Sequence, residues 1–288
     1  MRYDQPTTVD QAVALLADSG EAAAVLAGGT DLLVQLRAGL HRPEHIVDIK
    51  RIPELMSITE DGDGFTIGAA VPSAELNEHA GLKAAWPGVL EAMDLVGSTQ
   101  IQGRATLGGN LCNASPAADS VPAMIAAGAI CTIAGPNGRR EAPVDDIVTG
   151  PGQNSLGDGE FLVSIRLAPA MAGRGDAYLR LIPRTEMDIA VVGAGVCLAI
   201  DESGTCTDAK VSLGAVAPTQ VVVSDAQDIL VGSKVDDDAL AKLAAAASAA
   251  CSPIDDKRGT VDYRTKVAGV LARRAAGIAL QRAENSRS

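Results

Sequence analysis

Two short stretches of this 288-residue chain combine glycines with hydroxyl, amide and carboxylate side chains. The first, LAGGTDL, runs from Leu26 to Leu32, and the second, TLGGNLCNASPAADS, runs from Thr106 to Ser120. Glycine has no Cβ, so a backbone built from it can lie directly against a ligand. Both stretches therefore predict close contact between the main chain and a bound molecule.

The first stretch suits an anion. It joins a short apolar strand, AAAVLAGG, to an expected helix that begins near Asp31. The N–H groups of its glycines and the positive end of that helix together favour a phosphate. It is not a P-loop, because that motif requires a lysine that is absent here. An ordinary strand–turn–helix corner is the alternative.

The second stretch offers a different set of donors and acceptors. Thr106 supplies a hydroxyl, Gly108 and Gly109 supply bare backbone, and Asn110 both donates and accepts. Asp119, after a Ser-Pro turn, can accept a hydrogen bond from a sugar hydroxyl. We predict a ligand-contacting loop, in which Gly109 needs a positive φ; a plain loop is the alternative.

The sequence gives little support for a dinucleotide fingerprint, a catalytic triad or a metal site. GAGVCLA, from Gly193 to Ala199, starts like a dinucleotide fingerprint, but Leu198 replaces the third glycine and the flanks alternate as a strand does. The three histidines do not suggest a triad, and the five cysteines lack the spacing of a metal or cluster site. We predict no catalytic residue and no metal site, so a bound cofactor would have to supply any reactivity.

Composition narrows the class of protein. The formal net charge is −12 and aromatic residues make up only 2% of the chain, which argues against binding to nucleic acid or to anionic lipid. Alanine, valine and leucine must therefore form the core. The N-terminus does not resemble a signal peptide, and the scattered cysteines are typical of reduced thiols. We expect a cytoplasmic protein.

The pattern of elements predicts an α+β protein with two domains. The first 52 residues alternate as a small parallel β-α-β unit, and separated strands with helices between them follow as a mostly antiparallel unit. A linker is expected at residues 169–175, followed by a strand hairpin and two helices. The expected domains are residues 1–174, with subdomains of about 1–52 and 53–174, and residues 175–288.

The two glycine stretches resemble the paired flavin loops in FAD-binding subunits of the molybdenum hydroxylases, the xanthine dehydrogenase and carbon monoxide dehydrogenase family. The later stretches EFLVSIRLA, AYLRLIPRTEMDIAVVGAGVCLA, SLGAVAPT and DKRGTVDYRTKVAGVLARRA are also similar, so the likeness covers nearly the whole chain. It implies an FAD-binding domain of the vanillyl-alcohol-oxidase type, made of two α/β subdomains, and a small α+β C-terminal domain.

The resemblance also implies roles for individual residues. The first loop would wrap the FAD pyrophosphate, and the second would pass the ribityl chain and the flavin. Asp119 would meet the sugar hydroxyls or the ring edge, Leu162 would lie beside the flavin, and Arg180 takes a position often occupied by lysine near the isoalloxazine. The implied FAD-binding residues are Ala27, Gly28, Gly29, Thr30, Asp31, Thr106, Gly108, Gly109, Asn110, Asp119, Leu162 and Arg180.

Some residues depart from the family pattern. Ala105 stands where glycine is frequent, and Gln102 stands where arginine is frequent. Arginine in place of lysine at position 180 can stabilise a reduced, anionic flavin but cannot act as an acid.

The implied function is that of the flavoprotein subunit of a heterotrimeric molybdenum hydroxylase, comparable to the carbon monoxide dehydrogenase medium subunit. A molybdenum large subunit with molybdopterin would oxidise the substrate. A small subunit with [2Fe–2S] clusters would pass electrons to FAD on this chain, and from there to NAD⁺, a quinone or another acceptor. A dimer of heterotrimers is expected. The rival interpretations are a self-sufficient flavin-dependent oxidase and a non-catalytic nucleotide-binding module.

Overall fold

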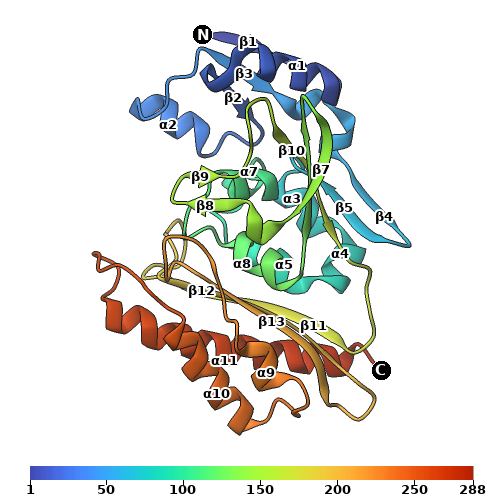
Figure 1. Ribbon diagram of the computed structural model, residues 1–288, viewed down its shortest axis with the longest axis vertical. Helices are drawn as coiled ribbons and strands as arrows, with labels where there is room; N and C mark the ends of the chain where they lie inside the picture. Colours follow the sequence, from blue (N-terminus) through green and yellow to red (C-terminus); the bar gives the residue numbers. More distant parts are fainter. Residues whose placement is uncertain (288) are drawn as a thin grey trace.

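The computed structural model describes residues 1–287, which form three units stacked along the long axis of the molecule (Figure 1). The N-terminal unit is a three-stranded parallel sheet in the order β1-β3-β2, which confirms the predicted parallel β-α-β unit. Its elements are β1 (Arg2–Asp4), α1 (Val9–Ser19), β2 (Ala23–Leu26), α2 (Leu32–Ala38) and β3 (His45–Asp48), with the short 3₁₀ helices η1 (Gly20–Ala22) and η2 (Ile49–Arg51).

The first helix shows how local sequence starts an element. The Thr8 hydroxyl accepts a hydrogen bond from the N–H of Gln11 at 3.2 Å, and the Gln11 side chain accepts one from the N–H of Thr7 at 3.0 Å. These bonds satisfy donors that the first helical turn leaves free. The helix then buries Val9 and Leu16 against the sheet.

The middle unit is built on a five-stranded antiparallel sheet in the order β4-β5-β10-β6-β7. This agrees with the mostly antiparallel unit expected after residue 52, because helices separate β5, β6 and β10 along the chain. The strands are β4 (Ile58–Asp61), β5 (Gly64–Gly68), β6 (Ile130–Gly135), β7 (Gly138–Pro143) and β10 (Phe161–Leu167), with a hairpin of β8 (Val148–Gly150) and β9 (Gln153–Asn154); the helices are η3 (Pro53–Met56), α3 (Ser73–Glu78), α4 (Ala80–Ala85), α5 (Pro87–Asp94), α6 (Thr99–Gln102), α7 (Leu107–Cys112), α8 (Ser120–Ala126) and η4 (Val144–Asp146).

The C-terminal unit is a four-stranded antiparallel sheet in the order β11-β12-β13-β14. GAGVCLA lies inside β12, so its interpretation as a strand is confirmed. The expected linker is two residues too long, because β11 already includes Arg174 and Gly175. The elements are β11 (Arg174–Leu181), β12 (Val192–Ile200), β13 (Cys206–Gly214), β14 (Val221–Val222), α9 (Ala226–Leu230), α10 (Asp237–Ala249) and α11 (Val261–Asn285).

Small residues let helices approach this sheet from both faces. Helix α11 covers one face, and α5 and α8 of the middle unit cover the other (Figure 1). A Cβ on Gly175 would lie 2.2 Å from the carbonyl oxygen of Ala279 in α11, and one on Gly195 would lie 2.5 Å from the carbonyl oxygen of Pro122 in α8. Buried alanines line the facing side of α11, which agrees with the predicted aromatic-poor core: Ala268, Ala272, Ala275, Ala276, Ala279 and Ala283.

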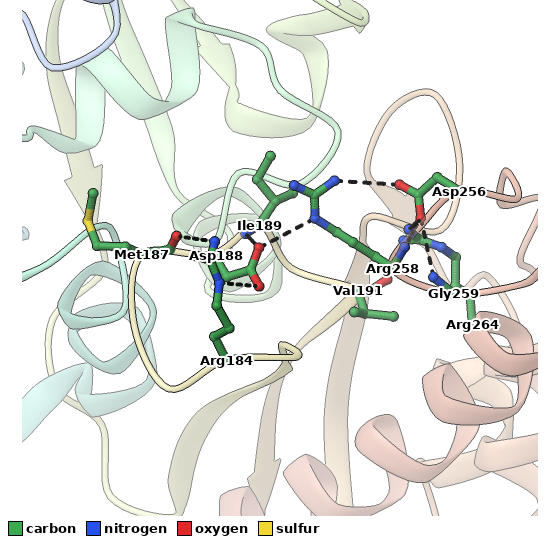
Figure 2. Close-up of polar contacts among 9 residues, drawn as sticks. All are labelled: Arg184, Met187, Asp188, Ile189, Val191, Asp256, Arg258, Gly259 and Arg264. Atoms are coloured by element: carbon green, nitrogen blue, oxygen red, sulfur yellow. Dashed lines mark hydrogen bonds and ion pairs between the residues drawn. The ribbon is translucent and has the colours of Figure 1, made fainter.

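Charged side chains tie the turn between β11 and β12 to the start of α11 (Figure 2). The buried guanidinium of Arg264 donates to the carbonyl of Val191 at 2.7 Å and to the carboxylate of Asp256 at 2.7 Å. Arg258 lies between the carboxylates of Asp188 and Asp256, at 3.5 and 3.7 Å. This network fixes where α11 begins relative to the sheet.

The close packing of β11 against α11 gives a stability test. We expect Gly175→Ala to lower the free energy of unfolding by about 1–3 kcal/mol, because the added methyl meets the backbone of α11. Gly277→Ala is the matched control: its methyl meets nothing within 4 Å, so it should raise stability by about 0.5–1 kcal/mol through helix propensity. Urea unfolding followed by circular dichroism measures both. Equal midpoints for the two variants would contradict the close approach.

Candidate functional site

A cavity of about 500 Å³ lies between the N-terminal and middle units, a volume within the usual range for small-molecule sites. Both glycine-rich stretches contribute to its wall. The structure therefore brings together segments that are distant in the sequence. Ten of the twelve predicted residues line this cavity: Ala27, Gly28, Gly29, Thr30, Asp31, Thr106, Gly108, Gly109, Asn110 and Leu162.

The first glycine stretch forms a tight corner between β2 and α2. Gly29 has a φ of +79°, a left-handed conformation that glycine adopts without the steric cost of a side chain. Among residues 1–287, leaving aside the side chain of Glu21, no acceptor is present for the N–H groups of Gly28, Gly29, Thr30 or Asp31. Four consecutive free donors beside a cavity, at the start of a helix, form a site for an anionic group.

The corner at Gly28 packs directly against Arg104, in the segment that precedes α7. A Cβ on Gly28 would lie 1.9 Å from the carbonyl oxygen of Arg104. A second link joins the same two units, because the side-chain amide of Gln35 in α2 donates to Asn113 after α7 at 3.0 Å. Gly28 therefore allows the two halves of the cavity wall to meet.

The first half of the second stretch forms the helix α7, where a loop was predicted. Thr106 caps α7, with its hydroxyl accepting from the N–H of Gly109 at 2.8 Å. Gly108 packs against Ala69, where a Cβ would lie 2.6 Å from the carbonyl oxygen. Gly109 is in the helix and does not have a positive φ, so that expectation is wrong; the residue that needs one is Gly29. Capping by Thr106 favours the helix over a loop.

The far end of this stretch is anchored to α8. The side-chain oxygen of Asn110 accepts hydrogen bonds from the hydroxyl of Ser120 at 2.7 Å and from its N–H at 3.4 Å. Ser120 is fully buried. These bonds fix the orientation of the Asn110 amide beside the cavity.

Asp119 and Arg180 do not line the cavity but pair with each other. Their side chains are 9% and 5% exposed, and the Arg180 guanidinium lies 2.7 Å from the Asp119 carboxylate. The hydroxyl of Tyr178 donates to the same carboxylate at 2.8 Å. Burial raises the pKa of Asp119 to about 6, although the charge of Arg180 and both hydrogen bonds oppose that shift. The pair joins the start of α8 to β11.

A third segment of the wall, residues 152–162, was missed apart from Leu162. Asn154 in β9 donates to the carbonyl of Cys112 at 2.9 Å. Glu160 accepts from the N–H of Gly157 at 2.8 Å and pairs with Arg140 at 2.7 Å, which holds the turn before β10. No local signal in the sequence indicated that this turn faces the cavity. The cavity-lining residues of this segment are Gly152, Asn154, Leu156, Gly157, Asp158, Gly159, Glu160, Phe161 and Leu162.

The structure also contains a hydrogen-bonded serine–histidine–aspartate chain that the sequence did not reveal. The two ring nitrogens of His45 lie 2.7 Å from the Ser19 hydroxyl and 2.8 Å from the Asp4 carboxylate. None of the three residues lines the cavity. The hydrogen bonds from Ser19 and Asp4 satisfy both ring nitrogens of a buried histidine.

The cavity wall contains little reactive chemistry of its own. Cys112 lines it, but burial raises the pKa of its thiol to about 12, so the nucleophilic thiolate is scarce at neutral pH. Within residues 1–287, no group of histidine, cysteine and carboxylate side chains could hold a metal ion. The arrangement is suited to binding an anionic ligand.

Family models account for nearly the whole chain. The model described as the FAD binding domain in molybdopterin dehydrogenase matches residues 1–170. The model described as the CO dehydrogenase flavoprotein C-terminal domain matches residues 177–279.

Individual proteins give the same result. The chain is 37% identical to the carbon monoxide dehydrogenase medium chain of Afipia carboxidovorans, over 98% of each chain. It is 35% identical to the xanthine dehydrogenase FAD-binding subunit of Escherichia coli O157:H7, over 76% of this chain and 75% of that protein. The solved structure of reconstituted CO dehydrogenase from Oligotropha carboxidovorans superposes with a TM-score of 0.93 at 36% identity, over 98% of each chain. The chain belongs to the family of FAD-binding flavoprotein subunits of molybdenum hydroxylases.

Proposed function

We propose that the cavity holds one FAD, bound without a covalent link, and that the first glycine stretch binds its pyrophosphate. The observation that carries this proposal is the row of four free N–H groups from Gly28 to Asp31 beside the cavity. Such donors bind phosphate oxygens without needing a cationic side chain. This matters in a chain with a net charge of −12, where a dianionic pyrophosphate would otherwise be repelled.

The second glycine stretch is proposed to face the ribityl chain and the flavin. Gly108 and Gly109 leave the surface of α7 free of side chains at the cavity wall. Thr106 places a polar atom at the start of the helix, and Asn110 places polar atoms within it. The apolar side chain of Leu162 would pack beside the ring system. Bound flavin supplies reversible electron transfer, which these side chains cannot provide themselves.

In this proposal, Asp119 and Arg180 affect the flavin indirectly. Their carboxylate and guanidinium form a buried ion pair between the start of α8 and β11, from which they would act on the flavin through α8. The proposed domain boundary between residues 174 and 175 falls one residue inside β11. The chain passes from the middle sheet to the C-terminal sheet between Leu167 and Arg174, so we place the boundary just before Arg174.

We further infer the assembly. The relative from Afipia carboxidovorans is a medium chain, and the one from Escherichia coli is a subunit. These names support a heterotrimer in which a small subunit with [2Fe–2S] clusters passes electrons to this chain, and a large subunit holds molybdenum and molybdopterin. Two heterotrimers would form a dimer, and electrons would leave this chain for an external acceptor.

We also propose that the protein works in a reducing compartment. All five cysteines are free thiols, which is typical of cytoplasmic proteins, and we propose that location here. Residues 1–287 contain no helix with both the length and the apolar character to cross a membrane.

Substitution of Gly109 tests the site. We expect Gly109→Val to abolish stoichiometric FAD binding, because its side chain would project from the first turn of α7 at the cavity wall. Gly62→Val is the control, since a Cβ there meets nothing within 4 Å. The ratio of flavin absorbance to protein absorbance after purification measures both. Full FAD content in Gly109→Val would refute the assigned role of α7.

The cofactor should be released by acid. We expect precipitation with trichloroacetic acid to leave all of the yellow chromophore in the supernatant, because the raised pKa of Cys112 disfavours covalent attachment. His41 also lines the cavity and is the other side chain to check. Colour in the pellet would contradict the prediction, and its loss in Cys112→Ala or His41→Ala would identify the attachment point.

Expression of the chain alone separates the three functions. We expect the isolated chain to be yellow and to show no substrate-dependent dye reduction. Dye reduction should appear only when the iron–sulfur and molybdenum subunits are added. Candidate substrates are carbon monoxide, purines, N-heterocycles and aldehydes. Dye reduction by the chain alone with an alcohol would support the oxidase, and a colourless chain that does not take up FAD would support the nucleotide-binding module.

A further inference from the structure

Lys50, which does not line the cavity, donates a hydrogen bond to the backbone of the first glycine stretch. The ammonium of Lys50 donates to the carbonyl oxygen of Ala27 at 2.8 Å and to the carboxylate of Asp48 at 2.7 Å. Lys50 follows β3 in the short helix η2, and its side chain is only 22% exposed. Ala27 itself lines the cavity, whereas Lys50 does not. The ammonium therefore contacts the cavity wall from its outer side.

The partner of this lysine is itself rigidly held. The Asp48 side chain is 4% exposed and accepts hydrogen bonds from the hydroxyl of Tyr3 at 2.6 Å and from the amide of Gln5 at 3.2 Å. Burial alone would raise the pKa of Asp48, but the hydrogen bonds from Lys50 and Tyr3 outweigh burial and hold it below its usual value. Asp48 is thus an ionised, fixed anchor for the ammonium.

The geometry of the peptide bond transmits this anchoring into the cavity. The peptide between Ala27 and Gly28 is trans, so the carbonyl of Ala27 and the N–H of Gly28 point in opposite directions. With the carbonyl held by Lys50 on the outer side, the N–H is directed away from Lys50, and it has no acceptor among residues 1–287. The contact of Gly28 with the Arg104 carbonyl limits rotation of the same peptide.

We propose that Lys50 is a positioning residue that fixes the Ala27–Gly28 peptide so that its N–H can bind the pyrophosphate of FAD. This inference rests on the proposed FAD site. Lys50 and Asp48 nearly cancel in charge, so the effect comes mainly from the fixed peptide orientation and less from attraction between the ammonium and the phosphate. Preorganised donors bind more tightly because they lose less freedom when the ligand arrives.

The test is a titration of FAD-depleted full-length chain with FAD, followed by flavin fluorescence. We expect Lys50→Met to raise the Kd by about 10- to 100-fold, since a lost charge-assisted bond and a freed peptide together cost about 1.4–2.7 kcal/mol. Lys50→Arg retains a cationic donor and should restore the Kd to within about threefold of the wild type. Lys210→Met is the matched control, because it removes a lysine paired with Asp145 at 3.2 Å in another part of the molecule.

The outcomes separate this inference from the FAD site itself. A wild-type chain that does not bind FAD would refute the proposed function. A wild-type chain that binds FAD while Lys50→Met matches Lys210→Met would refute only the role of Lys50, as would a failure of Lys50→Arg to rescue. Circular dichroism of the FAD-free variants checks folding, and if Lys50→Met does not fold, Lys50→Gln carries the same comparison.

Discussion

Gly28 and the backbone of Arg104 approach so closely that a methyl group on Gly28 would lie 1.9 Å from the Arg104 carbonyl oxygen. Gly28 follows β2 of the N-terminal unit and Arg104 lies between α6 and α7 of the middle unit, and the cavity lies where these two segments meet. Any larger side chain would push the corner after β2 away from the segment before α7. The left-handed turn at Gly29 and the bond from Gln35 to Asn113 depend on the same approach.

The site binds an anion with backbone groups and few cations. The free N–H groups lie on one short corner, and the ammonium of Lys50, which contacts that corner, donates to a carbonyl of its backbone. Arg180 does not line the cavity and pairs with Asp119 through one terminal nitrogen of its guanidinium. In an acidic chain, dipoles fixed by tight packing can favour a phosphate without adding positive surface charge. Affinity therefore depends on how precisely the corner is held.

The C-terminal unit supports the cavity indirectly. Arg180 in β11 pairs with Asp119, the next residue Ser120 donates to Asn110, and Asn110 lines the cavity. Glycines in β11 and β12 let α11 and α8 pack closely on the two faces of one sheet, so the start of α8 has a firm base. A continuous set of packed and hydrogen-bonded groups thus joins the cavity to the C-terminal sheet.

The sequence by itself determined most of the strands and helices and the chemistry of the glycine stretches. Strand alternation, helix capping and the missing side chain of glycine act between residues that are close in the chain, so they can be read from the sequence. It predicted GAGVCLA as a strand, and ten of the twelve residues that it proposed for FAD binding line one cavity. Apart from Leu162, it missed the wall segment of residues 152–162, and it also missed the pairing of Asp119 with Arg180 and the role of Lys50. Each of these depends on which surfaces meet after folding, and only the tertiary structure decides that, because contacts between distant segments leave no periodic pattern in the chain.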